Sequence, residues 1–187
     1  MKKQLRKSVF ETNSSSTHSI CINSTGHYMI PEKIHFENDG CFGWDWETYN
    51  EVYAKAGYLY IALLERCHWN CEDKNNAEQL LNAVKEVQNE LTSMLTELGV
   101  KEVTFDDVKI NEYTYADETH RYISFGGYID HTEDLCDFVT AVMEDKELLA
   151  HYLFCPDSCV ITGNDNSVER LSSYVPESCD VEFYKGN

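Results

Sequence analysis

The sequence is poor in basic residues, in proline and in long apolar runs. Its 187 residues hold 15 Lys and Arg against 33 Asp and Glu, only three Pro, and 42% hydrophobic residues. This composition excludes a disordered or collagen-like chain, and no apolar run approaches the roughly 18–20 residues of a membrane-spanning helix. A chain of this length can bury a core without the help of a disulfide or a metal. We therefore expect a single domain over residues 1–187 and no membrane among its partners.

Acidic charge dominates everything after the first seven residues. Lys2, Lys3, Arg6 and Lys7 lie at the start of the chain, and residues 8–187 keep eleven basic residues against 33 acidic ones, a net charge of −22. Such a body should repel nucleic acid by itself. It is suited to a basic protein surface as its partner, or to imitating a phosphate backbone.

Sequence motifs of the common nucleotide and hydrolase sites are also missing. There is no Walker A motif, no G-x-G-x-x-G, no H-E-x-x-H and no G-x-S-x-G. Dinucleotide binding, P-loop chemistry and the usual serine-nucleophile turn therefore have no support in the sequence. Any enzymatic activity has to be argued from other groups.

Eight cysteines are the next unusual feature, at positions 21, 41, 67, 71, 136, 155, 159 and 179. The first ten residues contain no signal-peptide pattern, so we expect a cytoplasmic protein with reduced thiols. Cys67 and Cys71 share their spacing with Cys155 and Cys159, and this spacing falls within the range of zinc ligands. The alternative is that all four are small apolar core residues, which is the commonest role of free cysteine.

The hydrophobic pattern predicts an α+β fold. Apolar residues at 3–4 spacing predict helices over about 48–67, 77–98, 132–143 and 145–154, with Asn76 and Gly99 as the caps of the second. Alternating apolar residues predict strands near residues 3–10, 18–23, 33–36, 103–110, 122–129, 160–162 and 181–184. We expect a mostly antiparallel sheet packed against about four helices.

Three polar segments follow or join predicted strands and could carry chemistry. They are residues 11–18, residues 130–131 and residues 164–166. The candidate catalytic residues are Glu11, Asn13, His18, Asp130 and His131, and the candidate phosphate- or substrate-binding residues are Ser14, Ser15, Ser16, Thr17, Asn164, Asp165 and Asn166.

The Ser-rich segment between Glu11 and His18 holds more polar groups than a turn requires. Its hydroxyls and backbone N–H groups can hold an anion, with Glu11 as a base or metal ligand and His18 as a proton donor. An ordinary polar hairpin loop is the alternative. Likewise, Asp130 or Thr132 could simply cap a helix, and residues 164–166 could simply form a turn.

If the sheet brings the three segments together, Glu11, His18, Asp130, His131 and Asp165 would form one pocket. The convergence is a hypothesis, because strand order cannot be read from the sequence. Direct proton transfer between its members would need hydrogen-bond reach.

The stretch Val9-Phe-Glu-Thr-Asn-Ser-Ser-Ser-Thr-His-Ser19 resembles the N-terminal signature of a family of small proteins from phages and mobile elements of Gram-positive bacteria. The segments 128–131 and 161–166 resemble that family too, and some type II-A anti-CRISPR proteins share the signature. Those proteins inhibit the RNA-guided DNA nuclease, in some cases by causing shortening of its guide RNA. The resemblance implies an anti-defence protein in the cytoplasm of a bacterial host, with the CRISPR effector nuclease or its guide RNA as partner.

The residues leave two other functions open. One is a phosphoryl-transfer or ligase-type enzyme that uses Glu11, Asp130 and Asp165 as Mg²⁺ ligands. The other is an acidic adaptor with no chemistry, in which the polar segments are structural turns.

Overall fold

The computed structural model describes residues 16–43, 45–71, 73, 75–130, 135–164, 171 and 174–185. These residues form the expected α+β fold. In chain order the elements are β1 (Ser16–Ile22), β2 (Lys33–Phe36), β3 (Cys41–Phe42), β4 (Glu47–Tyr49), α1 (Val52–Asn70), α2 (Ala77–Leu98), β5 (Glu102–Phe105), β6 (Lys109–Tyr115), β7 (Glu118–Ser124), β8 (Tyr128–Ile129), α3 (Cys136–Glu144), α4 (Lys146–Phe154), β9 (Cys159–Asn164) and β10 (Val181–Lys185).

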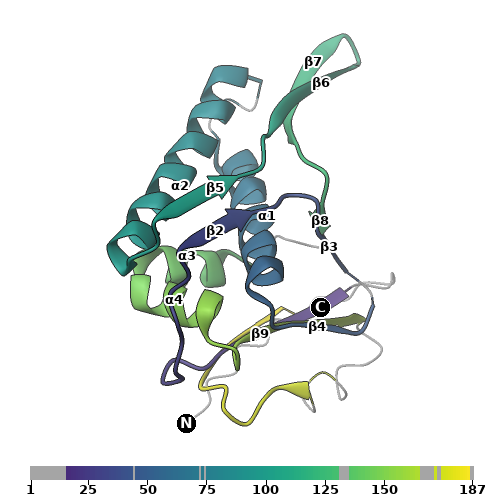
Figure 1. Ribbon diagram of the computed structural model, residues 1–187. Helices are drawn as coiled ribbons and strands as arrows, with labels where there is room; N and C mark the ends of the chain where they lie inside the picture. Colours follow the sequence, from purple (N-terminus) through teal and green to yellow (C-terminus); the bar gives the residue numbers. More distant parts are fainter. Residues whose placement is uncertain are drawn as a thin grey trace.

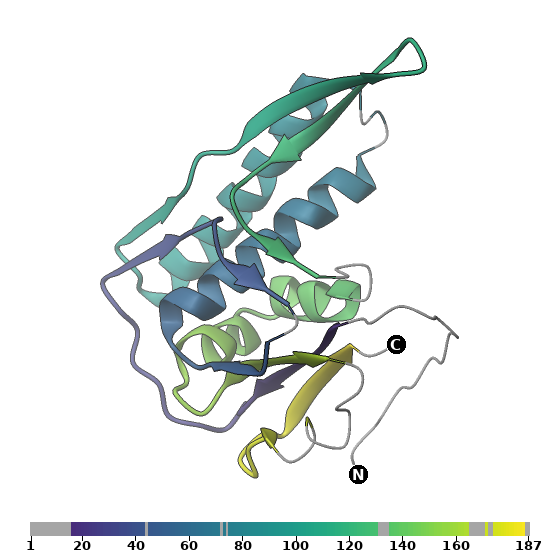
Figure 2. The ribbon, with the colours of Figure 1, turned by 90° about the vertical axis from the view of Figure 1, so that its right-hand side faces the viewer.

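The main sheet has four strands in the order β10-β1-β9-β4, and every neighbouring pair is antiparallel. Two short parallel pairs, β2 with β5 and β3 with β8, lie apart from it, and β6 and β7 form an antiparallel hairpin. In Figures 1 and 2 all four helices lie on one side of the main sheet, and the hairpin projects from the far end of the molecule.

Over His18–Cys21, strand β1 cannot also pair with the strand predicted at residues 3–10. Strand β1 pairs with β9 along Ser16–Cys21 and with β10 along His18–Ile22, so both of its edges are occupied over His18–Cys21. Ser16 and Thr17, which were expected in the loop, belong to this strand and are fully buried. Residues 3–10 themselves lie outside the described part of the chain.

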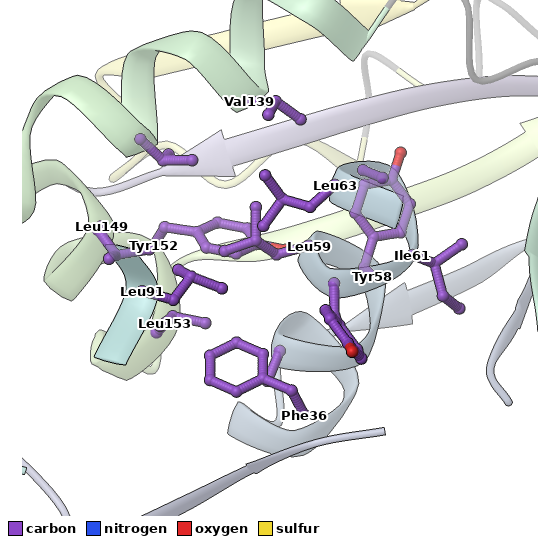
Figure 3. Close-up of a cluster of buried hydrophobic side chains, with 14 of the residues drawn as sticks. Phe36, Tyr58, Leu59, Ile61, Leu63, Leu91, Val139, Leu149, Tyr152 and Leu153 are labelled. Atoms are coloured by element: carbon purple, nitrogen blue, oxygen red, sulfur yellow. The ribbon is translucent and has the colours of Figure 1, made fainter. Parts of the chain in front are cut away.

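Helix α1 is buried on every side over residues 55–64. Each of these residues is buried, because the helix contacts α2, α3, α4, β2, β7 and β8. A helix that is apolar all round belongs in a core, so the sequence prediction of a well-buried helix is confirmed. Figure 3 shows its side chains meeting those of the neighbouring elements, among them Phe36, Leu91, Val139, Leu149 and Tyr152.

The predicted start of this helix is wrong. Thr48 was expected in its first turn, but it lies in β4, opposite Ile161 of β9, and α1 begins at Val52. Thr and Tyr favour strands, and β4 is stabilised by a partner that comes more than a hundred residues later. The helix also continues three residues beyond Cys67, into the predicted loop.

The second helix is capped as predicted. The Asn76 side chain accepts hydrogen bonds from the N–H groups of Glu78 and Gln79, and Gly99 ends the helix in the left-handed conformation with a φ of 110°. The predicted cap of the third helix, Thr132, lies outside the described residues, and α3 is described from Cys136.

Lys55 is the one charged side chain among the fully buried residues of α1. Its ammonium donates hydrogen bonds to the carbonyl oxygens of Cys155, at 2.8 Å, and Ser158, at 2.9 Å. The Tyr152 hydroxyl in turn donates to the Lys55 carbonyl at 2.8 Å. Burial of the charge lowers the pKa of Lys55 to about 8. This side chain therefore ties α1 to the turn between α4 and β9.

We expect the contribution of Lys55 to stability to increase with pH. Its pKa is about 8 in the folded chain and 10.5 in the unfolded one, so between these values the unfolded chain binds more proton. The free energy of unfolding of the wild type, minus that of Lys55→Met, should rise by roughly 3 kcal/mol across this window. The variant lacks both hydrogen bonds of Lys55 at every pH, so their loss does not contribute to the pH dependence of the difference.

Urea denaturation of both proteins at neutral pH and near pH 10 measures this difference. Subtracting the variant also removes the contributions of buried Tyr and Cys residues, which titrate in both proteins. A difference that does not change with pH would show that Lys55 keeps its ordinary pKa in the folded protein.

Candidate functional site

The structure describes five of the predicted site residues, namely Ser16, Thr17, His18, Asp130 and Asn164. The others lie outside the described residues: Glu11, Asn13, Ser14, Ser15, His131, Asp165 and Asn166. The geometry of the site is therefore built from the points where the three polar segments enter the described fold.

The three segments meet at Ser16. In the main sheet Ser16 of β1 stands opposite Asn164 at the end of β9. Its hydroxyl donates a hydrogen bond to the backbone carbonyl of Asp130, at 3.1 Å. Asp130 directly follows β8 and is held in place by its N–H, which donates to the Phe42 carbonyl at 2.9 Å. The ends of all three segments are thus adjacent, although only their described residues can be placed.

A buried hydrogen-bond chain extends from this point into the core. The His18 ring lies between two hydroxyls, with Tyr58 Oη 2.9 Å from Nδ1 and Ser16 Oγ 3.1 Å from Nε2. His18 and Tyr58 are fully buried, and their ring centroids are 5.8 Å apart. The chain connects α1 with β1 and with the end of β8.

Counting the protons shows which group donates in each hydrogen bond. Ser16 donates its one hydroxyl proton to the Asp130 carbonyl, so it accepts from Nε2–H of His18. Nδ1 of the neutral ring then accepts from the Tyr58 hydroxyl. Burial raises the pKa of Tyr58 well above its ordinary value, which keeps this phenol protonated and able to donate. A neutral His18 therefore satisfies every bond of the chain.

Within the described bonds, these side chains form a structural hydrogen-bond network in the resting state. Ser16 and His18 are within the reach of a nucleophile and its base, but Nε2 carries the proton in the resting state. To accept the Ser16 proton at Nε2, His18 has to carry its own proton on Nδ1 instead, from where it can donate a hydrogen bond to the Tyr58 oxygen. Both hydroxyl and imidazole are buried, so the chemistry also requires a ligand to reach them.

Thr17 and Asn164 border the same end of the sheet. The Thr17 hydroxyl is buried and has no hydrogen-bond partner among the described residues. Thr17 stands opposite Gly163, where a Cβ atom would come within 2.8 Å of the Trp46 ring. Glycine at this position lets the indole cover β9, so Trp46 is a packing residue of the sheet.

The zinc candidates do not gather. Cys67 and Cys71 lie at the end of α1, and their thiols approach the Ala83 carbonyl and the Asp73 carbonyl. Cys155 and Cys159 flank the turn between α4 and β9. Within the described part of the chain, no three His, Cys, Asp or Glu side chains are arranged to hold a metal ion. Of the proposed Mg²⁺ ligands, only Asp130 is described.

Sequence reasoning missed Tyr58, the donor that fixes the His18 tautomer. A tyrosine in a buried helix needs a partner for its hydroxyl. This requirement is the feature of the sequence that could have identified Tyr58. The partner itself could not be named, because it comes from the other side of the core.

No helix in the described ranges has the length and the apolar character of a membrane span. No protein-family model, curated protein or solved structure matches this chain. The function is therefore argued from the residues and their geometry.

The Tyr58–His18 hydrogen bond should make a measurable contribution to the free energy of unfolding. Tyr58→Phe removes the donor and leaves the buried Nδ1 acceptor without its partner, which costs about 1–3 kcal/mol. Tyr53→Phe is the matched control, since Tyr53 lies on the same helix and is 63% exposed. Its free energy of unfolding should stay within about 0.5 kcal/mol of the wild type.

Chemical denaturation of the two variants decides the point. A double-mutant cycle with His18→Asn should give a coupling energy of about 1 kcal/mol if the two side chains act through one bond. Additive effects would mean that the hydrogen bond contributes nothing.

Proposed function

We propose that the protein is an anti-defence inhibitor that docks on the basic nucleic-acid channel of a type II CRISPR nuclease. Two features support this function: the acidic charge of the body and an exposed tyrosine face on the β6–β7 hairpin. The resemblance of the segments 9–19, 128–131 and 161–166 supplies the class of partner. The tyrosine face is the observation on which the docking mode rests.

The hairpin carries its aromatic residues on one side. Tyr113 stands opposite His120, Tyr115 opposite Glu118, and Asn111 opposite Tyr122. These positions alternate along the strands, so they share one face. Tyr115, Tyr113 and Tyr122 are 71%, 55% and 38% exposed. Tyr113 stacks on His120 at 5.2 Å and lies 6.1 Å from Tyr122, so the rings form a continuous surface.

The opposite face of the hairpin holds it to the body. Ile110 and Ile123 stand opposite each other there, and both belong to or pack on the main core. Arg121 donates a hydrogen bond to the Asn75 carbonyl at the start of α2. The tip turns through Ala116 and Asp117, both with positive φ, and points away from the helices (Figure 2). The aromatic face is therefore presented outward on an anchored ribbon.

Tyrosine and carboxylate together suit an arginine-rich partner. Tyrosine supplies a large contact area with few rotatable bonds and is common at protein interfaces. Its ring attracts a guanidinium. Glu118, opposite Tyr115, and Asp117 at the tip are exposed on or beside the same face. The nuclease keeps a positively charged channel for the guide–target heteroduplex. The hairpin, together with the acidic body behind it, would compete with nucleic acid for that channel.

We expect this protein to inhibit DNA cleavage by the guided nuclease, with a potency that decreases as salt increases. Changing Tyr113 and Tyr115 together to Ser should weaken inhibition at least tenfold, because aromatic anchors at an interface each contribute more than about 1 kcal/mol. Tyr53→Ser, an exposed tyrosine on α1, is the matched control and should inhibit like the wild type.

The measurement is the half-inhibitory concentration in a cleavage assay at several salt concentrations. Undiminished cleavage at a tenfold molar excess of the wild type would reject the function. Equal potency of the double variant and the control would reject the hairpin as the docking element.

A second function, cleavage of the guide RNA, is favoured by the Ser16–His18–Tyr58 chain. A phosphodiester at this end of the sheet would find an imidazole for proton transfer and hydroxyls to hold its oxygens. Glu11 and the Ser-rich segment belong to the same proposed site. Here the protein would shorten the guide in addition to binding the nuclease.

Guide length separates blocking from cleavage. We expect the wild type to shorten the guide RNA on a denaturing gel, and His18→Asn to leave it intact while still inhibiting cleavage at a higher concentration. Circular dichroism and the unfolding midpoint check that the variant is folded. A full-length guide after incubation with the wild type would leave binding as the only mode of inhibition.

A further inference from the structure

Three cysteine thiols meet within the main sheet. Cys21 lies on β1, directly opposite Cys159 on β9, and Cys179 lies just before β10 on the other side of β1. The Cys179 thiol donates a hydrogen bond to the Val181 carbonyl at 3.1 Å, and its side chain packs in the same cluster as those of Cys21 and Cys159. Together with Ile161 and Leu171 they form a small buried cluster, separate from the main core.

The fold, not the sequence spacing, selects these three. Cys155, four residues before Cys159, is buried on the other side of the turn and shares no thiol contact with this group in the bonds described. We name Cys21, Cys159 and Cys179 the thiol cluster. It belongs to neither of the proposed functions above.

Backbone geometry allows a bridge between Cys21 and Cys159. Residues directly opposite in an antiparallel pair have Cα atoms about 4.5–5.5 Å apart. Disulfides span Cα separations of roughly 4.4–6.8 Å. Closing this bond therefore requires side-chain rotation and little movement of the strands.

The three thiols differ in nucleophilic character. The neighbouring Cys21 side chain lowers the pKa of Cys159, and the Lys55 ammonium acts in the same direction. Cys159 in turn raises the pKa of Cys21 to about 12, and Cys21 raises the pKa of Cys179. Cys159 is therefore the most acidic thiol of the three.

We propose that the thiol cluster is an oxidation site for hydrogen peroxide, at which Cys159 is oxidised and Cys21 closes a disulfide. The Cys159 thiolate attacks one peroxide oxygen, the O–O bond breaks, and a sulfenic acid and a hydroxide form. The Cys21 sulfur then attacks the sulfenic sulfur, the S–O bond breaks, and the oxygen leaves as water with the Cys21 proton. Two thiols and one peroxide give one disulfide and two waters.

Burial makes the site selective for a small oxidant. Cys21 is fully buried, and Cys159 and Cys179 are 3% and 8% exposed, whereas Cys41 and Cys136 are exposed. A bulky maleimide should therefore label Cys41 and Cys136 in the native protein and spare the cluster. Peroxide is close to water in size and reaches it through local opening of the sheet.

The experiment is peptide mapping of the full-length protein. The protein is treated with hydrogen peroxide, unfolded in maleimide, digested and analysed by mass spectrometry, with a sample kept in reductant as reference. We expect the loss of two hydrogen masses and a peptide joining Cys21 to Cys159. Cys155→Ser is the matched control and should keep the bridge, as should Cys179→Ser.

Two variants test the order of the steps. Cys21→Ser should stop the reaction at the sulfenic acid of Cys159, which dimedone traps, and Cys159→Ser should abolish the bridge. Labelling of all eight thiols in the peroxide-treated wild type, or a bridge joining Cys21 to Cys179, would overturn the proposal. The peptide map of the peroxide-treated wild type tests the proposal even if a variant fails to fold.

Discussion

The burial of α1 on every side is the constraint on which the rest of the structure depends. A helix satisfies its own backbone hydrogen bonds, so it can lie in a core where a strand would need partners. The other elements then only have to cover its apolar surface, and helices α2, α3 and α4 with strands β2, β7 and β8 do so. The polar tips that α1 carries into the core, on Lys55, Tyr58 and Tyr60, each have a partner.

Lys55 and Tyr58 connect α1 to opposite ends of the β1–β9 pair. Tyr58 reaches His18, close to Ser16 and Asn164, where the predicted polar segments meet. Lys55 reaches the turn before Cys159, where β9 begins and the thiol cluster lies. One helix therefore supplies a hydrogen-bond partner to an imidazole at one end and a positive charge near a thiol at the other, although both groups lie far from it in the sequence.

The features that sequence predicted well are local ones. Asn76 and Gly99 mark the ends of α2 because a cap bonds to residues two or three positions away. What the sequence did not predict is long-range: Thr48 lies in a strand beside β9, and β1 pairs with β9 and β10 from the other end of the described chain. The same reason explains the cysteines. Their spacing along the chain suggested Cys155 with Cys159, whereas pairing across strands joins Cys159 to Cys21.

Strand β1 has a consequence for how the protein folds. Its bonds to the rest of the sheet connect residues very far apart in sequence, 135 positions from Asn23 to Ser158 and 163 from Ser19 to Glu182. Contacts of such separation form late, because the chain must first close large loops. During synthesis β1 leaves the ribosome well before β9 and β10, its partners in the described sheet. Its buried apolar residues, Ile20 and Ile22, therefore stay exposed to chaperones or to other chains while the long intervening segment is translated.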